Sequence, residues 1–531
     1  MRDSLQRKII NEKNCYFLLI FFSLIVSFFY TVDQRAISAA LILSKKINYS
    51  DVQNVLNLGY NNSWTLTYQI LKIFINLGVN LKLLNFIILA ISLFVSVLGI
   101  YLISEALSKN IIFSLFISCF LILGNVILGN INFGNLDYPV LIASEHTNGM
   151  ISQAISLLVF GLTARNKLNL AISVSILALA FHVVIGVWLL SILSLSIVFF
   201  KNKIFFVNFF IKKNIIKIIV ALIIVVFSFV SFKFNQVKIP FDENNLLYDL
   251  YMKHWDLHRN TLLEINFIYI FFSIILLIII SISLKKRDYK NNNFFFKIII
   301  LQILTSFVLY ILFKLFPNIF TGILLKIMPS RFFLTHSVFG VAIIFSLLFF
   351  NFKKIFLNKN IYLFLIIILL IHPAFNYNKY IKLFKKLSTN HILINKVDDS
   401  HFWRKVKNTD IGNGVILTSL EICTKTIQKG YKPILFCIES IDDIAYINKL
   451  VVPIHDILKI IYNIDFKNPP EKNHGGIWYN DSYRKVFEKR SSIEWASIST
   501  KYNIKALILP VDWKINAEIH FFGNKYNYYT F

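Results

Sequence analysis

Apolar runs of about 18–20 residues recur along the first 375 positions of this 531-residue chain. Each run is long enough to cross the hydrocarbon core of a bilayer as one helix. The runs are continuous rather than alternating, which excludes a membrane β-barrel. Apolar residues make up 56% of the chain and charged residues only 16%, so a soluble multidomain enzyme and a disordered chain are excluded as well. We therefore expect a mainly α, multi-span transmembrane helical bundle.

The positions of the apolar runs predict eleven spans. They are residues 16–30, 83–103, 111–129, 150–162, 170–182, 184–200, 216–232, 265–283, 298–316, 332–351 and 360–374. The stretch 170–200 is too long for one straight crossing, and His182 lies near its midpoint. We expect two short helices joined by a tight turn there. An ionisable residue at this depth is either functional or satisfies the free backbone carbonyls of the turn.

The distribution of Lys and Arg predicts the orientation. With a cytoplasmic N-terminus, the inner segments, among them 201–215 and 284–297, carry more basic residues than the longer outer segments. This bias follows the positive-inside rule. It places residues 376–531 outside and makes 1–375 the transmembrane domain. We expect a multi-pass protein of the bacterial inner (cytoplasmic) membrane, with an uncleaved first span and the lipid bilayer as its constant partner.

The formal net charge of +27 does not indicate a nucleic-acid partner. The 55 Lys and Arg residues are scattered between the spans, and no nucleic-acid recognition module appears among them. Compositional bias and membrane topology account for the charge. The sequence does not indicate an oligomeric state.

Residues 376–531 differ in character from the apolar part. Short β-like runs at 415–419, 434–438 and 506–511 alternate with helical patterns, which predicts a small α/β domain with a mostly parallel sheet. Residues 482–502 read as one long helix. Cys423 and Cys437 lie fourteen positions apart and are either a disulfide or two buried thiols. No nucleotide-binding fingerprint occurs.

Acids, cations and aromatic residues gather in the predicted outer segments, of which 31–82 is the largest. Such a mixture suits a site that holds an anionic phosphate and activates a hydroxyl. Our candidates are Asp33 and Asp137 as catalytic carboxylates, and Arg331, Arg259, His258, His254 and His146 as substrate-binding residues.

Several of these candidates also have a simpler interpretation. His254 and His258 are four apart, which places them on one helical face as a metal pair would be, but a third ligand is not evident and an interfacial helix explains them as well. Asp33 is either a working carboxylate or a solvated loop residue. Arg331 either binds substrate or buries its apolar stem in the bilayer while its charged head reaches the membrane surface.

Four features together carry a family resemblance. Asp33 follows the first span in a long outer loop that contains a surface helix. The segment "SEHTNGMISQAISLLVFGLTARNKLNLAISVSILALAFHVVIGVWLL" forms a helix, a basic turn and a hairpin, and "MPSRFFLTHSVFG" brings an arginine to a late span. With the outer C-terminal domain, this layout resembles the GT-C superfamily of polytopic membrane glycosyltransferases. It is also similar to bacterial multi-span proteins with "HWDLHR" and "PVDW" segments, a likeness that implies no activity.

The resemblance implies a reaction at the outer membrane face. A polyprenyl-phosphate-linked sugar would be the donor, in the modification of an envelope polysaccharide or glycolipid. Asp33, or alternatively Asp137, would remove a proton from the acceptor hydroxyl, and Arg331, Arg259 and His258 would hold the phosphate. A divalent metal is compatible with this chemistry, but the acids are too dispersed to indicate one. Transfer to protein is not expected, because no W-W-D-type motif is present.

Two other classes of function stay open. A transporter or flippase for a lipid-linked glycan would also have many spans and interfacial charge, although no internal repeat is seen. A non-catalytic scaffold of envelope assembly is the third alternative.

Overall fold

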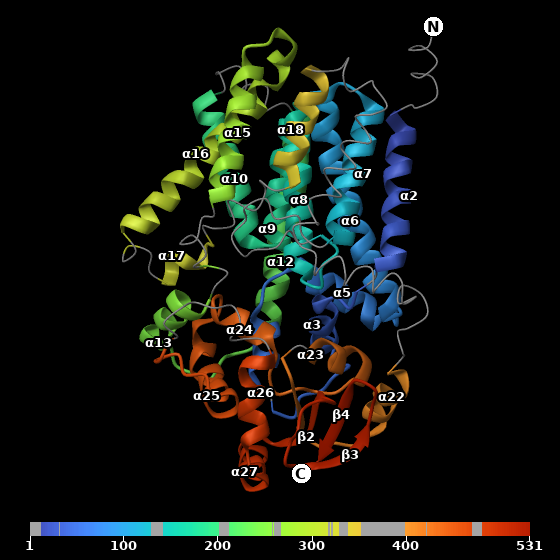
Figure 1. Cartoon of the computed structure of the whole chain (residues 1–531), viewed down its shortest axis with the longest axis vertical. Helices are drawn as coiled ribbons and strands as arrows, with labels where there is room; N and C mark the ends of the chain where they lie inside the picture. The colour runs from blue at the N-terminus through green and yellow to red at the C-terminus, as the bar shows by residue number, and fades with distance from the viewer. Residues whose placement is uncertain are drawn as a thin grey trace.

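A computed structural model shows a helical bundle and a sheet-containing domain stacked along the long axis of the molecule (Figure 1). The structure describes residues 12–30, 32–51, 53–128, 142–200, 212–256, 259, 267–316, 319, 322–328, 338–351, 399–420, 422–469 and 480–530. The start of α2 and the C-terminal sheet lie at opposite ends of the molecule.

The bundle and its flanking helices account for most of the described chain. The membrane-side helices are α2 (Glu12–Tyr30), α6 (Leu81–Ser108), α7 (Ile111–Leu128), α8 (Thr147–Ala164), α9 (Leu168–Phe181), α10 (Val183–Phe200), α12 (Lys212–Asn235), α15 (Phe267–Leu284), η3 (Arg287–Asn292), α16 (Asn293–Leu315) and α18 (Val338–Asn351). The helices toward the C-terminal domain are α3 (Arg35–Leu43), α4 (Val55–Asn62), α5 (Leu66–Asn76), α13 (Asn245–Leu250), η1 (Tyr251–Trp255) and α17 (Gly322–Lys326).

The described residues confirm a membrane protein of several apolar helices. Five of their helices are long and apolar enough to cross a bilayer: Leu81–Ser108, Thr147–Ala164, Val183–Phe200, Ile215–Asn235 and Arg287–Leu312. The apolar residues 14–30 and 35–43 would add a sixth span, bent by 80°. Four further apolar helices, within α7, α9, α15 and α18, are shorter. The predicted span at 360–374 lies outside the described residues, and the predicted count of eleven stays a prediction.

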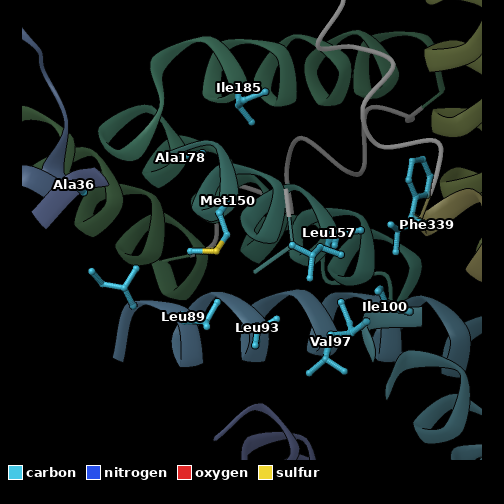
Figure 2. Packing of buried hydrophobic residues seen from close by; sticks show 14 of the residues in the cluster. Ala36, Leu89, Leu93, Val97, Ile100, Met150, Leu157, Ala178, Ile185 and Phe339 are labelled. Carbon is cyan, nitrogen blue, oxygen red and sulfur yellow. The ribbon is translucent and has the colours of Figure 1, made fainter. Parts of the chain in front are cut away.

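Helices α6 and α8 cross closely, with a glycine from each helix at the contact. A Cβ atom on Gly99 would lie 2.4 Å from the backbone carbonyl carbon of Leu157, and one on Gly161 would lie 2.6 Å from the carbonyl oxygen of Gly99. Small residues at such crossings let helix backbones approach closely in a bilayer. Around this contact, the buried side chains of Leu93 and Val97 on α6 and of Leu157 on α8 belong to one hydrophobic cluster (Figure 2).

We expect Gly99→Ala to destabilise the bundle by about 2–3 kcal/mol, because the added methyl meets backbone atoms that cannot rotate away. Thermal unfolding of the purified protein in detergent measures this. Gly340→Ala is the matched control, since its Cβ would meet the Phe272 ring at 2.8 Å, and a ring can shift. Equal melting temperatures for the two variants would contradict the tight crossing.

The predicted break at His182 is confirmed. Helix α9 ends at Phe181, α10 begins at Val183, and His182 between them has an extended backbone (φ −157°, ψ 97°). Gly186 then passes close to the preceding helix, since its Cβ would lie 2.6 Å from the amide nitrogen of Leu179. The chain therefore turns sharply at His182, as its apolar length predicted.

The C-terminal domain surrounds a mixed sheet. In the described residues its elements are α22 (Ser400–Asn408), β1 (Val415–Thr418), α23 (Cys423–Lys425), η7 (Thr426–Gly430), α24 (Ile438–Ile444), η8 (Asn448–Leu450), α25 (Val451–Tyr462), α26 (Asn480–Lys489), α27 (Ser492–Tyr502), β2 (Ile504–Pro510), β3 (Glu518–Phe522) and β4 (Tyr526–Thr530). The strand order is β1-β2-β4-β3, with β1 parallel to β2 and the other pairs antiparallel.

The α/β class is confirmed, but three details of the domain were predicted wrongly. The sheet is not mostly parallel, since only the β1–β2 pair is parallel among its described strands. Residues 434–438 contribute a single bridge, from Ile434 to Ile416, instead of a strand. Residues 482–502 form two helices, because Ser491 and Glu494 make a capping box that starts α27.

Candidate functional site

The structure describes four of the seven predicted site residues. Asp33 lies just after α2, His146 precedes α8, His254 lies in η1, and Arg259 follows η1. Asp137, His258 and Arg331 lie outside the described residues. The predicted convergence of Asp33, Asp137 and Arg331 on one cavity therefore stays a prediction.

Three consecutive residues after α2 contact the C-terminal domain. The Asp33 carboxylate lies 3.6 Å from Nζ of Lys429. Gln34 is buried, and its backbone carbonyl accepts a hydrogen bond from Nε2 of Gln428 at 2.8 Å. Because these partners are nearly 400 positions away, the loop that was predicted to bear the catalytic carboxylate is also a docking surface for the C-terminal domain.

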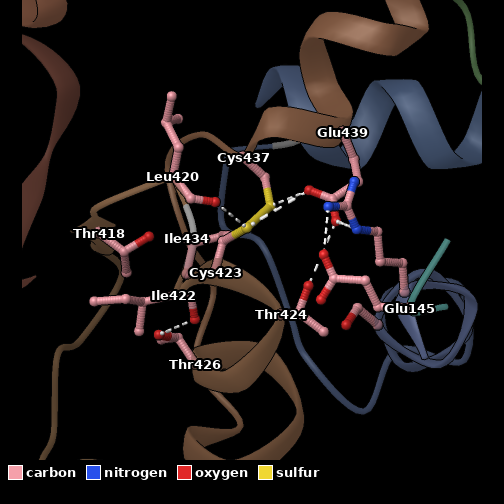
Figure 3. Close-up of a disulfide and its surroundings, with 12 residues drawn as sticks. Glu145, Thr418, Leu420, Ile422, Cys423, Thr424, Thr426, Ile434, Cys437 and Glu439 are labelled. Carbon is pink, nitrogen blue, oxygen red and sulfur yellow. Dashed lines mark hydrogen bonds and ion pairs between the residues drawn. A yellow bond between two sulfur atoms is a disulfide. The ribbon is translucent and has the colours of Figure 1, made fainter. Parts of the chain in front are cut away.

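Arg35 lies between two carboxylates from different parts of the chain. Its Nη2 is 2.7 Å from Oε1 of Glu145, and its Nε is 3.0 Å from Oε1 of Glu439 (Figure 3). Glu439 lies on α24, and its side chain is only 12% exposed. Burial raises the pKa of Glu439, and the charge of Arg35 opposes that rise. We call Arg35, Glu145 and Glu439 the Arg35 cluster.

A disulfide lies directly beside the Arg35 cluster. Cys423 and Cys437 are joined, with their Cα atoms 5.8 Å apart, so the disulfide alternative is the one the structure shows. Figure 3 shows Glu439 next to the bridge. The bridge fixes the start of α24 to α23, and so holds Glu439 within reach of Arg35.

Replacing both Cys423 and Cys437 with serine should lower stability by about 3 kcal/mol, the value expected for a loop of this length. Melting temperatures with and without reductant measure the effect: the wild type should shift and the double variant should not. Cys119→Ser is the control, because Cys119 is a free thiol. A reductant effect that persists in the double variant would contradict a stabilising role for this bridge.

A second acid of α24 packs against α4. Oδ1 of Asp443 accepts a hydrogen bond from the Ser63 hydroxyl at 3.0 Å, while Oδ2 is inaccessible and has no partner among the described residues. A Cβ on Gly59 would lie 2.1 Å from this Oδ2, so a larger residue at position 59 would require the Asp443 side chain to move. Burial raises the pKa of Asp443 to about 8, the Ser63 hydroxyl opposes the rise, and the neighbouring Asp442 and Glu439 add to it.

The raised pKa of Asp443 predicts an unusual pH dependence. A carboxyl with a higher pKa in the folded than in the unfolded protein stabilises the fold fully below about pH 4, and this contribution is lost as the pH rises toward 8. Asp443→Asn should therefore flatten the fall of melting temperature between roughly pH 5 and pH 8.5. Asp242→Asn is the control, because Asp242 is an exposed acid that does not act on Asp443. A wild-type slope in Asp443→Asn would contradict this assignment.

Arg259 forms the centre of a separate cluster. Its side chain is completely buried, its Nη1 is paired with the Asp256 carboxylate, and its guanidinium carbon lies 5.1 Å from the centre of the Tyr446 ring. Burial opposes its charge, but Asp256 and then Tyr446 hold the pKa of Arg259 above its usual value.

Two further basic residues are coupled electrostatically to this guanidinium. The charge of Arg259 acts on His182, at the α9–α10 break, and on Lys326 of α17. Burial lowers the pKa of Lys326, and the charge of Arg259 lowers it further. Nζ of Lys326 donates to the carbonyl oxygen of Tyr446 at 3.3 Å. We call Arg259, Asp256, His182, Lys326 and Tyr446 the Arg259 cluster.

The described residues satisfy the guanidinium of Arg259 only in part. Nε and Nη2 are buried and have no hydrogen-bond partner among the described residues. A buried donor without a partner costs about 1–3 kcal/mol, and more when the group is charged. The Arg259 cluster therefore combines guanidinium donors that lack partners among the described residues with an amine, an imidazole and the Asp256 carboxylate. Asp442 and Glu243 act on the cluster electrostatically, and a bound anion would supply the missing acceptors.

Helix α24 lies between the two clusters. Asp442 acts electrostatically on both Arg35 and Arg259, and the Tyr251 hydroxyl donates to the carbonyl of Ile441 at 2.9 Å. The acids of α24 were not predicted as site residues. Their grouping in "IESIDDI" is visible in the sequence, but the partners come from loops some 200 to 400 positions away.

The remaining candidates have local roles in the described structure. His146 precedes the first turn of α8, and its carbonyl accepts from the Met150 amide at 2.9 Å. His254 lies in η1, where burial and then the charge of Lys253 lower its pKa.

The predicted metal pair of His254 and His258 is not tested, since His258 is not described. Among the described residues, the close group of metal-ligand types is Cys423, Cys437 and Glu439. Its two sulfurs are joined in the disulfide, so they are not available as ligands.

No protein-family model matches the sequence, and no curated protein matches it significantly.

Proposed function

We propose that this chain is an integral membrane glycosyltransferase that takes a sugar from a polyprenyl-phosphate donor at the membrane face next to the C-terminal domain. The observation that carries the proposal is Arg259, a buried guanidinium with two nitrogens that have no partner among the described residues and whose charge acts on Lys326 and His182. The proposal also keeps the predicted eleven spans, the outward C-terminal domain and the bacterial inner membrane.

A phosphate group suits the Arg259 cluster chemically. A guanidinium presents its donors in a planar fork that matches two phosphate oxygens, and such charge-assisted bonds are about twice as strong as neutral ones. A phosphate would supply acceptors for Nε and Nη2. In the reaction, the same donors would stabilise the charge that grows on the phosphate as the sugar leaves.

The location also supports a lipid-linked substrate. His182 belongs to a break between two apolar helices, α9 and α10, whereas Asp256 follows η1 and Tyr446 follows α24 of the C-terminal domain. A ligand phosphate held between them would be close to the ends of membrane helices, where the head of a lipid lies, and its polyprenyl chain would extend into the bilayer.

Asp33 is our proposed general base. It follows α2 directly, its side chain is one-third exposed, and Lys429 at 3.6 Å orients it. A carboxylate that is accessible and positioned can accept the proton of an acceptor hydroxyl. Asp137 is the alternative base and Arg331 a further phosphate ligand, as the sequence predicted.

One observation favours a non-catalytic scaffold as the second candidate. Asp33 and Arg35 are both engaged by the C-terminal domain, through Lys429 and Glu439. A protein that only docks two domains would show the same contacts. The two nitrogens of Arg259 that lack a partner among the described residues favour the transferase over that alternative.

Reconstitution in liposomes with a panel of radiolabelled polyprenyl-phosphate sugars separates the classes of function. A glycosyltransferase should convert one donor to free polyprenyl phosphate and deliver its sugar to an added acceptor lipid or glycan. A flippase should move the donor across the bilayer without cleaving it. A scaffold should do neither, and that result would overturn the proposal.

A further inference from the structure

A polar pocket lies far from the Arg259 cluster, at the end of the bundle opposite the C-terminal sheet. It has a volume of about 240 Å³ and is formed by four segments: the α8–α9 turn, the end of α10, η3 and the first turn of α16. Its walls include the side chains of Asn166, Phe200, Lys290, Asn291 and Lys297.

Hydrogen bonds between these segments fix the pocket. Asn166 has a left-handed backbone (φ 57°), and its Nδ2 donates to the carbonyl of Asn291 at 2.6 Å. The buried Asn292 donates through Nδ2 to the carbonyl of Ala164 at 3.0 Å. The α8–α9 turn is therefore tied to the start of α16 at two points, so the pocket is part of the folded architecture.

The residues that line the pocket combine two positively charged lysines with the apolar ring of Phe200. Lys290 and Lys297 have no carboxylate within ion-pair distance in the described part of the chain, and no acid lines the pocket. Nζ of Lys297 lies 5.1 Å from the centre of the Phe200 ring. One nearby acid, Asp288, lies 4.0 Å from Nζ of Lys109.

The pocket also lies where lipid headgroups are expected. It is at the last residue of the membrane-spanning helix α10 and in the first turn of α16, whose apolar residues belong to another span. The neighbouring Val198 and Phe199 are 69% and 65% exposed, which leaves an apolar path along α10 for acyl chains.

We propose that this pocket binds the phosphate-bearing headgroup of an anionic phospholipid. Lys290 and Lys297 attract the phosphate, the asparagine carboxamides offer neutral hydrogen bonds to the glycerol part, and the acyl chains lie against α10. Basic pockets at helix ends on the cytoplasmic side bind lipid heads in this way. The site is separate from the proposed transferase site, so either proposal can fail alone.

Native mass spectrometry of the full-length protein in detergent tests the site, with phosphatidylglycerol and phosphatidylcholine as probes. Lys290→Gln/Lys297→Gln should weaken phosphatidylglycerol binding roughly tenfold or more and leave phosphatidylcholine binding unchanged. Lys167→Gln/Lys285→Gln is the matched control, because it removes the same charge from the same end of the bundle outside the pocket. Melting temperatures of both variants verify that they fold.

Three results would overturn the proposal. An equal loss in the control variant would show diffuse attraction by a basic surface. Equal binding of the two lipids by the wild type would show that the charge of the headgroup does not matter. Displacement of the lipid by inorganic phosphate at the same concentration would assign the pocket to a free anion.

Discussion

Asp33→Asn should lower the rate of sugar transfer roughly 10²–10⁴-fold, because an amide cannot accept the proton of the acceptor hydroxyl. The loss should appear in kcat rather than in donor binding, since Asp33 contacts Lys429 and no described residue of the Arg259 cluster. Initial rates at saturating donor measure it, with the donor that the liposome panel identifies.

Asp51→Asn is the matched control for this experiment. Asp51 is an exposed acid of the same loop, and its carboxylate accepts from the Gln53 amide at 2.8 Å. A wild-type rate in Asp33→Asn would transfer the role of base to Asp137 or favour the scaffold. An equal loss in Asp51→Asn would show that the loop as a whole is being disturbed.

The second large effect is expected at Arg259. Removing the guanidinium should weaken donor binding about 10–100-fold, the value of one or two charge-assisted hydrogen bonds. Because Arg259→Gln alone leaves the Asp256 carboxylate buried without its partner, the informative variant is Arg259→Gln/Asp256→Asn. Donor titration in nanodiscs gives the affinity, and the melting temperature verifies the fold.

Two further variants make this result specific. Arg259→Lys keeps the charge but loses the planar fork, so its affinity should fall between those of the wild type and the double variant. Arg404→Gln removes an exposed guanidinium from α22 and should change nothing. If Arg259→Gln/Asp256→Asn binds donor as the wild type does, Arg259 has only a structural role.

Apolar length predicted much of the helical architecture. The break at His182 followed from a run that was too long for one span, and it lies where expected. The strands β1 and β2 also fall on predicted β-like runs. Strands β3 and β4 were missed because "EIHFF" and "YNYYT" are short and only partly apolar. The start of α27 could have been found, since "SSIE" carries the capping-box pattern.

The candidate site was less predictable, for a physical reason. A sequence shows which residues are ionisable, and Asp33 and Arg259 were selected on that basis. It does not show that Glu439 reaches Arg35, since the contact depends on a disulfide and on the docking of a distant domain. The closeness of Gly59 to Asp443 arises in the same way. Long-range contacts between loops leave no periodic signal in the chain.

Photo-crosslinking with a diazirine-bearing polyprenyl phosphate tests the central claim most directly. In native membranes, the phosphate-proximal probe should label peptides that contain Arg259, Lys326 or Tyr446, and Arg259→Gln/Asp256→Asn should abolish that labelling while Arg404→Gln should not. Two results would contradict a donor site at Arg259. The first is labelling confined to the opposite end of the bundle, around α10 and the start of α16. The second is labelling of Tyr446 that is unchanged in Arg259→Gln/Asp256→Asn.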